Sequence, residues 1–288
     1  MHHHRTRNRR CIVKHDRLGS NIHKCVDVLT SNNTSYEREM MKDNGSQNIR
    51  MVLLSVIIVL AVVAVVTVFE PDEQTDEQTD DDDTGVLSYY DKKCKSFSEE
   101  NADLAKGQIV FIGDSITDLY VLDDHYSDLS LKCYNRGISG DTTFGVMDRL
   151  KISLYDIDPS IVVLMIGTND INGGHNVNLI MQRYAWIMDD IYANLPGVEL
   201  YCMSIIPQNS QLEEYTSIRI DHTTPVIMSA NEMIRQLADE KGATYLDLFT
   251  LVADGDNHLI RGYSDDGIHL NYAGLAVWTD LIKPYLDR

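Results

Sequence analysis

Residues 109–115 read Ile-Val-Phe-Ile-Gly-Asp-Ser, an unbroken apolar run that ends in a polar turn. A short run of β-branched and aromatic residues without a polar face predicts a strand that is buried on both sides, as in a parallel sheet. Ligands bind such sheets at the carboxyl ends of the strands. The turn at 113–115 is therefore a place where functional groups are expected.

The same alternation continues through the last two hundred residues of the chain. Strands are expected at 109–112, 131–134, 161–166, 200–206 and 244–249. Amphipathic helices are expected around and between them at 87–105, 143–152, 177–194, 225–241 and 273–286. Strands that alternate with helices predict an α/β fold, here a three-layer α/β/α domain around a parallel sheet of about five strands. Residues 86–288 are a suitable length for one such domain.

The chain before this domain divides into three segments of different composition. Residues 51–69 are uncharged and almost entirely apolar, and a helix of that length spans the ~30 Å hydrocarbon core of a bilayer. We therefore expect a transmembrane signal anchor at 51–69. Residues 1–50 are expected to be a disordered basic tail, and residues 70–85 an acidic disordered linker, because neither can bury enough apolar area to fold.

The charges on either side of the apolar segment predict its orientation. Residues 1–50 contain ten Lys or Arg and five Asp or Glu, a net charge of +5, so the rest of a chain of net charge −19 carries −24. The positive-inside rule then places the amino terminus in the cytoplasm and the domain outside. A cleaved signal peptide is the alternative, although its apolar core is usually shorter and nearer the terminus. The acidic exterior part disfavours nucleic acid and anionic lipid surfaces as partners.

Three further motifs accompany the Gly-Asp-Ser turn. They are Gly137-Ile138-Ser139-Gly140-Asp141, Gly167-Thr168-Asn169-Asp170 and Asp266-Gly267-Ile268-His269. The first two follow expected strands, so they should reach the same sheet edge as Ser115. A serine hydroxyl needs a base to become a nucleophile. On a helical turn Asp266 and His269 would share a face, so that the carboxylate holds Nδ1–H and leaves Nε2 as that base.

The same motifs contain candidate donors for an oxyanion. Two or three N–H groups must face the charge that develops on a tetrahedral intermediate. The candidates are the backbone N–H groups of Ser115 and Gly140 and the side-chain amide of Asn169, and a glycine at 140 lets the backbone approach a substrate closely. Each residue alone is common in turns and caps, but together they predict acyl transfer. Asp114 and Asp170 are expected to cap helices or brace loops.

The longer phrasing of these motifs carries a family resemblance, over residues 107–288, to the SGNH or GDSL hydrolase superfamily. It includes Phe111-Ile112-Gly113-Asp114-Ser115-Ile116-Thr117, Asn135-Arg136-Gly137-Ile138-Ser139-Gly140-Asp141-Thr142-Thr143 and Asp266-Gly267-Ile268-His269-Leu270-Asn271. The resemblance implies a flavodoxin-like fold and carboxylic ester hydrolysis without a metal or cofactor. It also implies a triad of Ser115, Asp266 and His269, and an oxyanion hole of Ser115, Gly140 and Asn169. An α/β-hydrolase elbow would need glycine at the position of Thr117.

The resemblance points to a serine esterase, and the apolar segment and its flanking charges predict that it is anchored in a membrane with the domain outside the cytoplasm. We expect short acyl esters, acetyl foremost, on carbohydrate as substrates. Residues 208–222 are largely polar and offer no apolar lid. A lysophospholipase or platelet-activating-factor acetylhydrolase-like lipid esterase is the alternative, followed by an O-acyltransferase or a non-catalytic glycan-binding module. Cys94, Cys133 and Cys202 allow at most one disulfide in the domain, and buried or incidental thiols are expected.

Overall fold

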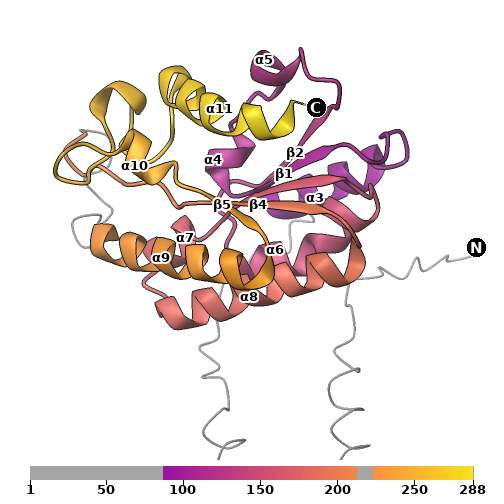
Figure 1. The fold of residues 1–288 in the computed structure, drawn as a ribbon, viewed down its shortest axis with the longest axis horizontal. Coiled ribbons are helices and arrows are strands. Elements are labelled where there is room, and N and C mark those ends of the chain that lie inside the picture. Colours follow the sequence, from indigo (N-terminus) through magenta and orange to yellow (C-terminus); the bar gives the residue numbers. More distant parts are fainter. Residues whose placement is uncertain (1–86, 213–222, 288) are drawn as a thin grey trace, which may run out of the picture. The chain divides into compact units, whose positions relative to one another are not determined.

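The computed structural model of the protein describes residues 87–212 and 223–287. Its centre is a parallel sheet of five strands in the order β2-β1-β3-β4-β5 (Figure 1). The strands are β1 (Ile109–Gly113), β2 (Cys133–Gly137), β3 (Ile161–Met165), β4 (Glu199–Met203) and β5 (Thr244–Leu246). This is the doubly wound order of flavodoxin-like folds, in which the chain starts inside the sheet and reverses direction after the first edge strand. The expected parallel sheet is confirmed.

Helices cover both faces of the sheet, and they fall into a long and a short class. The long ones are α3 (Tyr89–Glu100), α6 (Thr143–Leu150), α8 (Val177–Asn194), α9 (Thr223–Lys241) and α11 (Tyr272–Leu286). The short ones are α4 (Ser115–Asp118), α5 (Asp123–Tyr126), α7 (Thr168–Asn172) and α10 (Phe249–Val252). A π-helical turn at Lys151–Tyr155 continues α6, and a 3₁₀ turn lies at Arg261–Tyr263. The long helices were expected from the sequence; the short ones were not.

The sheet separates two apolar cores. Val110 and Ile112 of β1 face a core with buried side chains of α6, α8 and α9, whereas Ile109 and Phe111 face a second core with α4, α5 and α11. Figure 1 shows α8 and α9 on one side of the sheet, and α5 and α11 on the other. All five residues of β1 are buried, which explains why this strand has no polar face.

Two strands end earlier than their apolar runs suggest. After β4, the Asn231 amide pairs with both the N–H and the C=O of Ile205, at 2.8 Å each, and so replaces the sheet partners of that residue. After β5, the N–H of Phe249 donates to Ser204 Oγ at 2.7 Å and the residue begins α10. The strands expected at 200–206 and 244–249 were therefore too long, because side chains distant in sequence hydrogen-bond to the backbone groups that a longer strand would pair in the sheet.

The edge strand β2 lies further along the chain than expected, at 133–137 instead of 131–134. It contains the charged residue Arg136, which is almost fully buried. The guanidinium of Arg136 lies over the ring of Phe97 in α3, 4.5 Å from its centroid, and pairs with Glu100 at 3.2 Å. A charge that is neutralised and covered by α3 can occupy a strand that its polarity alone disfavours.

The expected tail (1–50), membrane span (51–69) and linker (70–85) lie outside the described residues. In the part of the chain that the structure describes, no helix is both long and apolar enough to cross a membrane.

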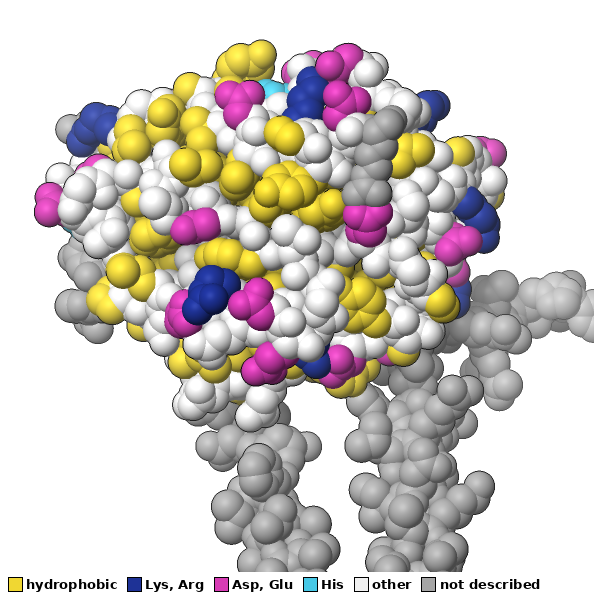
Figure 2. Space-filling view, viewed as in Figure 1, with side chains coloured by type: hydrophobic (Ala, Val, Ile, Leu, Met, Phe, Trp, Pro, Cys, Tyr) yellow, Lys and Arg dark blue, Asp and Glu magenta, His cyan; other side chains and the backbone are white. Residues whose placement is uncertain are grey.

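On the face of the domain drawn in Figure 2, basic side chains lie beside acidic ones, with apolar side chains between them. Cys94, Cys133 and Cys202 are free thiols.

Candidate active site

The segment from β1 into α4 presents Ser115 at the carboxyl edge of the sheet. Asp114 precedes the helix and caps it, because its Oδ1 accepts a hydrogen bond from the N–H of Ile116 at 3.0 Å. Gly113 is required by close packing, since a Cβ there would lie 2.1 Å from the carbonyl oxygen of Met165 in β3. The strand therefore ends where only glycine fits, and the next two residues turn the chain into a helix that begins with the serine.

His269 and Asp266 reach Ser115 from the other end of the domain. The Nε2 atom of His269 lies 2.8 Å from Ser115 Oγ, and its Nδ1 atom lies 2.6 Å from Asp266 Oδ2. These are hydrogen-bond distances. The relay expected from the sequence is thus assembled from residues 154 positions apart in the chain.

The backbone between Asp266 and His269 is a turn, and the expected helical turn is wrong. Gly267 has a φ of +86°, which a right-handed helix cannot contain. Asp266 Oδ1 accepts the N–H groups of Ile268 and His269, at 2.8 Å each, and so stabilises the turn. A Cβ at position 267 would lie 2.2 Å from the carbonyl oxygen of Asn209. The glycine, and not helical periodicity, brings the carboxylate to the imidazole.

The carboxyl group of Asp266 is held in its ionised form. Burial alone would raise its pKa, but the hydrogen bonds from the His269 side chain and from the two backbone N–H groups outweigh burial and lower the pKa below its ordinary value. An ionised carboxylate accepts the Nδ1–H of the imidazole and favours the tautomer that leaves Nε2 free to accept a proton.

The expected oxyanion donors lie on the loop after β2, which carries Gly140, and in the first turns of α4 and α7, which carry Ser115 and Asn169. Gly140 has a φ of +83° and open space where a Cβ would project. The Asn169 side chain donates to the carbonyl oxygen of Asp141 at 2.8 Å, which joins the start of α7 to the loop after β2. An amide NH₂ has two N–H groups, so one remains for a ligand. Among the described residues, no acceptor in the protein takes the backbone N–H of Ser115 or Gly140.

A buried ion pair beneath the loops was not found from the sequence. Arg149 in α6 is 1% exposed and donates from Nε to Asp141 Oδ2 at 2.7 Å. It also donates to the carbonyl oxygens of Gly113 and Arg136, at 2.9 and 2.7 Å, and to Ser153 Oγ at 2.9 Å. One guanidinium therefore joins the ends of β1 and β2 to the residue that follows Gly140.

Two further carboxyl groups lie in this buried region. Burial raises the pKa of Asp114 to about 7, against the lowering effect of the Ile116 N–H and with a smaller raising effect from the charge of Asp141. Asp170 accepts hydrogen bonds from the N–H and Oγ1 of Thr143, at 2.8 and 2.6 Å. Asp114 therefore caps a helix and Asp170 braces a loop, as expected.

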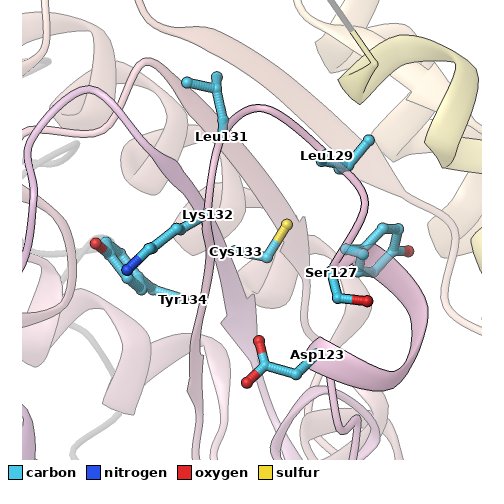
Figure 3. Close-up of a pocket in the computed structure, with 8 residues that line it drawn as sticks. Asp123, Ser127, Leu129, Leu131, Lys132, Cys133 and Tyr134 are labelled. Carbon is cyan, nitrogen blue, oxygen red and sulfur yellow. The ribbon is translucent and has the colours of Figure 1, made fainter.

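A separate hollow of about 570 Å³ lies at the other end of the sheet. It is lined by Cys133 and Tyr134 at the start of β2, by the preceding Lys132, and by residues of the segment around α5 (Figure 3). In a parallel sheet the amino ends of the strands lie opposite the edge that carries Ser115. This hollow is therefore not part of the site that contains Ser115, His269 and Asp266.

Comparison with known proteins gives an independent assignment. Residues 111–277 match the model of the GDSL-like lipase/acylhydrolase family. A protein from Streptococcus pneumonia, described as a candidate platelet activating factor, is 28% identical, with a TM-score of 0.64 over 69% of this chain and 92% of its own. A GDSL-like lipase from Bacteroides thetaiotaomicron VPI-5482 is 25% identical, with a TM-score of 0.61 over 69% of this chain and 98% of its own.

A third structure is similar in fold alone. It is an acetyl-xylooligosaccharide esterase from Geobacillus Stearmophilus that is 19% identical, with a TM-score of 0.50 over 64% of this chain and 95% of its own. No curated protein matches the chain at the significance required.

Proposed function

The chain belongs to the GDSL-like lipase/acylhydrolase family of carboxylic ester hydrolases, and we propose that it hydrolyses short acyl esters through a triad of Ser115, His269 and Asp266. The observation that carries this proposal is the relay of 2.8 Å and 2.6 Å from the serine hydroxyl through the imidazole to the carboxylate. Each atom has the partner that its role in acyl transfer requires.

In the proposed acylation step, Ser115 Oγ attacks the ester carbonyl while His269 Nε2 takes the hydroxyl proton. The carbonyl oxygen becomes an oxyanion that receives hydrogen bonds from the N–H groups of Ser115 and Gly140 and from the Asn169 amide. When the C–O bond breaks, His269 gives its proton to the departing alcohol, and the acyl group remains on the serine.

Deacylation repeats these steps with water as the nucleophile. His269 takes a proton from water as the water oxygen attacks the acyl carbonyl, and the same donors bind the second oxyanion. The collapse of this intermediate returns the proton to Ser115 Oγ and releases the carboxylic acid. Asp266 keeps its charge throughout and stabilises the imidazolium that forms twice in each turnover.

We propose short acyl groups on carbohydrate as the substrate class. The net charge of −24 after residue 50 disfavours approach to anionic lipid. Tyr272 lies three residues beyond His269 and is 71% exposed. Its ring packs against His125 at a tilt of 37°, with 5.3 Å between the ring centroids, and its exposed side is available to a sugar ring. A lipid ester is the second candidate, because of the 28% identity to the Streptococcus protein.

The two candidates predict different substrate preferences for the purified full-length chain. We expect kcat/KM for p-nitrophenyl acetate to exceed that for the decanoate by about tenfold or more, since a site built for a short acyl group excludes a longer one. Acetylated oligosaccharides should be hydrolysed, and Tyr272→Ala should raise their KM while leaving the KM for p-nitrophenyl acetate unchanged. Faster hydrolysis of a lysophospholipid than of any acetylated sugar would contradict the carbohydrate assignment.

An acyltransferase uses the same acyl-enzyme but passes the acyl group to an alcohol. The two activities separate when products are measured with and without an acceptor sugar. If the enzyme is a hydrolase, free acetate should account for all of the substrate consumed, whatever the sugar concentration. Acetylated acceptor as the main product would instead identify a transferase.

We also propose that residues 51–69 anchor the enzyme in a membrane with its domain outside the cytoplasm. The support is the nineteen-residue uncharged run and the change from +5 before it to −24 after it. Replacing Val59 and Val62 with lysine should release the chain from membranes, because a lysine at the centre of a span costs about 3 kcal/mol. Leucine at both positions is the matched control.

The orientation has its own measurement. Protease added to intact cells should remove the domain carrying Ser115 and leave a fragment that contains the amino-terminal tail. A domain that survives this treatment, but is digested after the cells are broken, would contradict the proposed topology.

A further inference from the structure

Asp118, the last residue of α4, joins three parts of the structure. Its side chain is 7% exposed, and it lies one helical turn beyond Ser115. Oδ1 accepts a hydrogen bond from Lys93 Nζ at 2.8 Å, and Oδ2 accepts one from the Tyr89 hydroxyl at 2.7 Å. Oδ2 also accepts the N–H and the hydroxyl of Ser139, at 2.9 and 2.7 Å. The carboxylate therefore links α3, the helix of the nucleophile, and the loop after β2.

The loop residue that Asp118 contacts directly precedes a proposed oxyanion donor in the sequence. Ser139 precedes Gly140, whose φ of +83° and lack of a side chain give the backbone little intrinsic restraint. The direction of the Gly140 N–H depends on the peptide plane between these two residues. Asp118 holds Ser139 by both its backbone and its side chain, so it fixes one end of that plane relative to Ser115.

The α3 contacts come from outside the part of the chain that matches the family model. Lys93 and Tyr89 precede the matched residues 111–277. A third side chain of the same helix, Tyr90, donates from its hydroxyl to the carbonyl oxygen of Gly145 at 2.9 Å. Helix α3 is thus attached to both ends of the segment that carries Gly140.

We infer that α3 holds in place the loop after β2 that carries Ser139 and Gly140. Lys93 and Tyr89 are positioning residues that act on this loop through Asp118. The inference rests on the proposed function, because it concerns a donor of the same site. Neither residue is proposed to touch the substrate.

The charge of Asp118 supports this assignment. Burial would raise the pKa of this carboxyl, but hydrogen bonds from Lys93, Tyr89 and Ser139 together lower it below its ordinary value. An ionised carboxylate is a pure acceptor, and it binds N–H and O–H donors more strongly than a neutral carboxyl does. Lys93 and Tyr89 therefore strengthen the hold of Asp118 on Ser139 as well as orienting it.

The test compares variants of the full-length chain on p-nitrophenyl acetate. Lys93→Met keeps an unbranched side chain but removes the ammonium group, which also lies over the ring of Phe97, 5.1 Å from its centroid. We expect kcat to fall about tenfold with KM within about twofold, because an oxyanion donor acts on the transition state and not on substrate binding. Tyr89→Phe should lower kcat in the same way. Lys93→Arg, which keeps the positive charge, should have a kcat close to that of the wild-type chain. Lys95→Met, which removes the exposed pair with Glu99 on the same helix, is the control and should have no effect.

A double-mutant cycle with Ser139→Ala separates positioning from a general loss of structure. Ser139→Ala removes the hydroxyl bond to Asp118 but keeps the N–H bond. If Lys93 acts through Asp118 on Ser139, the two substitutions together should therefore lower kcat by clearly less than the product of their separate effects. Unchanged kcat in both Lys93→Met and Tyr89→Phe would overturn the inference, and so would fully additive effects. If Ser115→Ala abolishes activity while these variants keep it, the inference about α3 is wrong and the proposed function stands. Activity that survives Ser115→Ala overturns both.

Discussion

Replacement of Ser115 by alanine is expected to lower kcat for p-nitrophenyl acetate by about 10⁴-fold or more. The hydroxyl is the only group of Ser115 that meets His269 Nε2, and without it no acyl-enzyme can form. The backbone N–H of residue 115 and the Asn169 amide remain in the variant. The residual rate should therefore be that of water attack on an ester held by the oxyanion donors.

The variant should fold normally, because Ser115 is half-buried and its hydroxyl makes no other hydrogen bond among the described residues. Ser127→Ala, at an exposed serine that follows α5, is the matched control and should keep full activity. A fluorophosphonate probe should label the wild-type chain and the control but not Ser115→Ala. Equal turnover by the wild-type and Ser115→Ala chains would contradict the proposed mechanism.

Residues close in sequence carried most of what could be predicted. The run at 109–113 is apolar at every position because both sides of β1 are buried, so its place in the sheet follows from composition. Helix α8 has the bounds that its amphipathic pattern predicts, Val177–Asn194. The four motifs could be assigned to one site because strands of a parallel sheet end at a common edge.

Contacts between distant residues could not be predicted in the same way. Arg149 and Asp118 have no local pattern that distinguishes them from surface charges, and their roles arise from partners such as Gly113 and Ser139. Asp266 and His269 are in contact, as the sequence predicts, but the expected helical geometry was wrong. The sequence does not reveal that the carbonyl oxygen of Asn209 occupies the space beside Gly267. The sequence predicts candidate reacting groups, whereas the side chains that hold those groups in place depend on packing.

The second large effect concerns one of these supporting groups. Arg149→Met should destabilise the domain by about 3–5 kcal/mol, because it removes one partner of a buried ion pair and leaves the other uncompensated. Methionine fills much of the volume but offers no N–H group. The carboxylate of Asp141 and the carbonyl oxygens of Gly113 and Arg136 would each lose a donor. Urea unfolding followed by circular dichroism measures the change, and Arg235→Met, at an exposed pair with Glu232, should leave the midpoint unchanged.

The loss should also depend on pH in a direction set by Asp141. Burial raises the pKa of this carboxyl even though Arg149 lowers it, and without Arg149 the pKa must rise further. A carboxyl whose pKa is raised on folding binds its proton more tightly in the folded state. Its contribution to stability is fully present below the ordinary pKa and is lost as pH rises through the folded value. Arg149→Met should therefore cost less stability at pH 5 than at pH 8.

A second substitution that removes the unpaired carboxylate of Asp141 tests this explanation. In the double variant with Asp141→Asn, the carboxylate that Arg149→Met leaves unpaired is gone, so the part of the loss between pH 5 and pH 8 that Asp141 causes should disappear and part of the stability should return. The Asn side-chain oxygen can still accept the Thr142 N–H, which now donates to Asp141 Oδ1 at 2.9 Å. A pH dependence that persists in the double variant would mean that another group titrates. An Arg149→Met loss no larger than that of Arg235→Met would mean that the guanidinium does not hold the loops together.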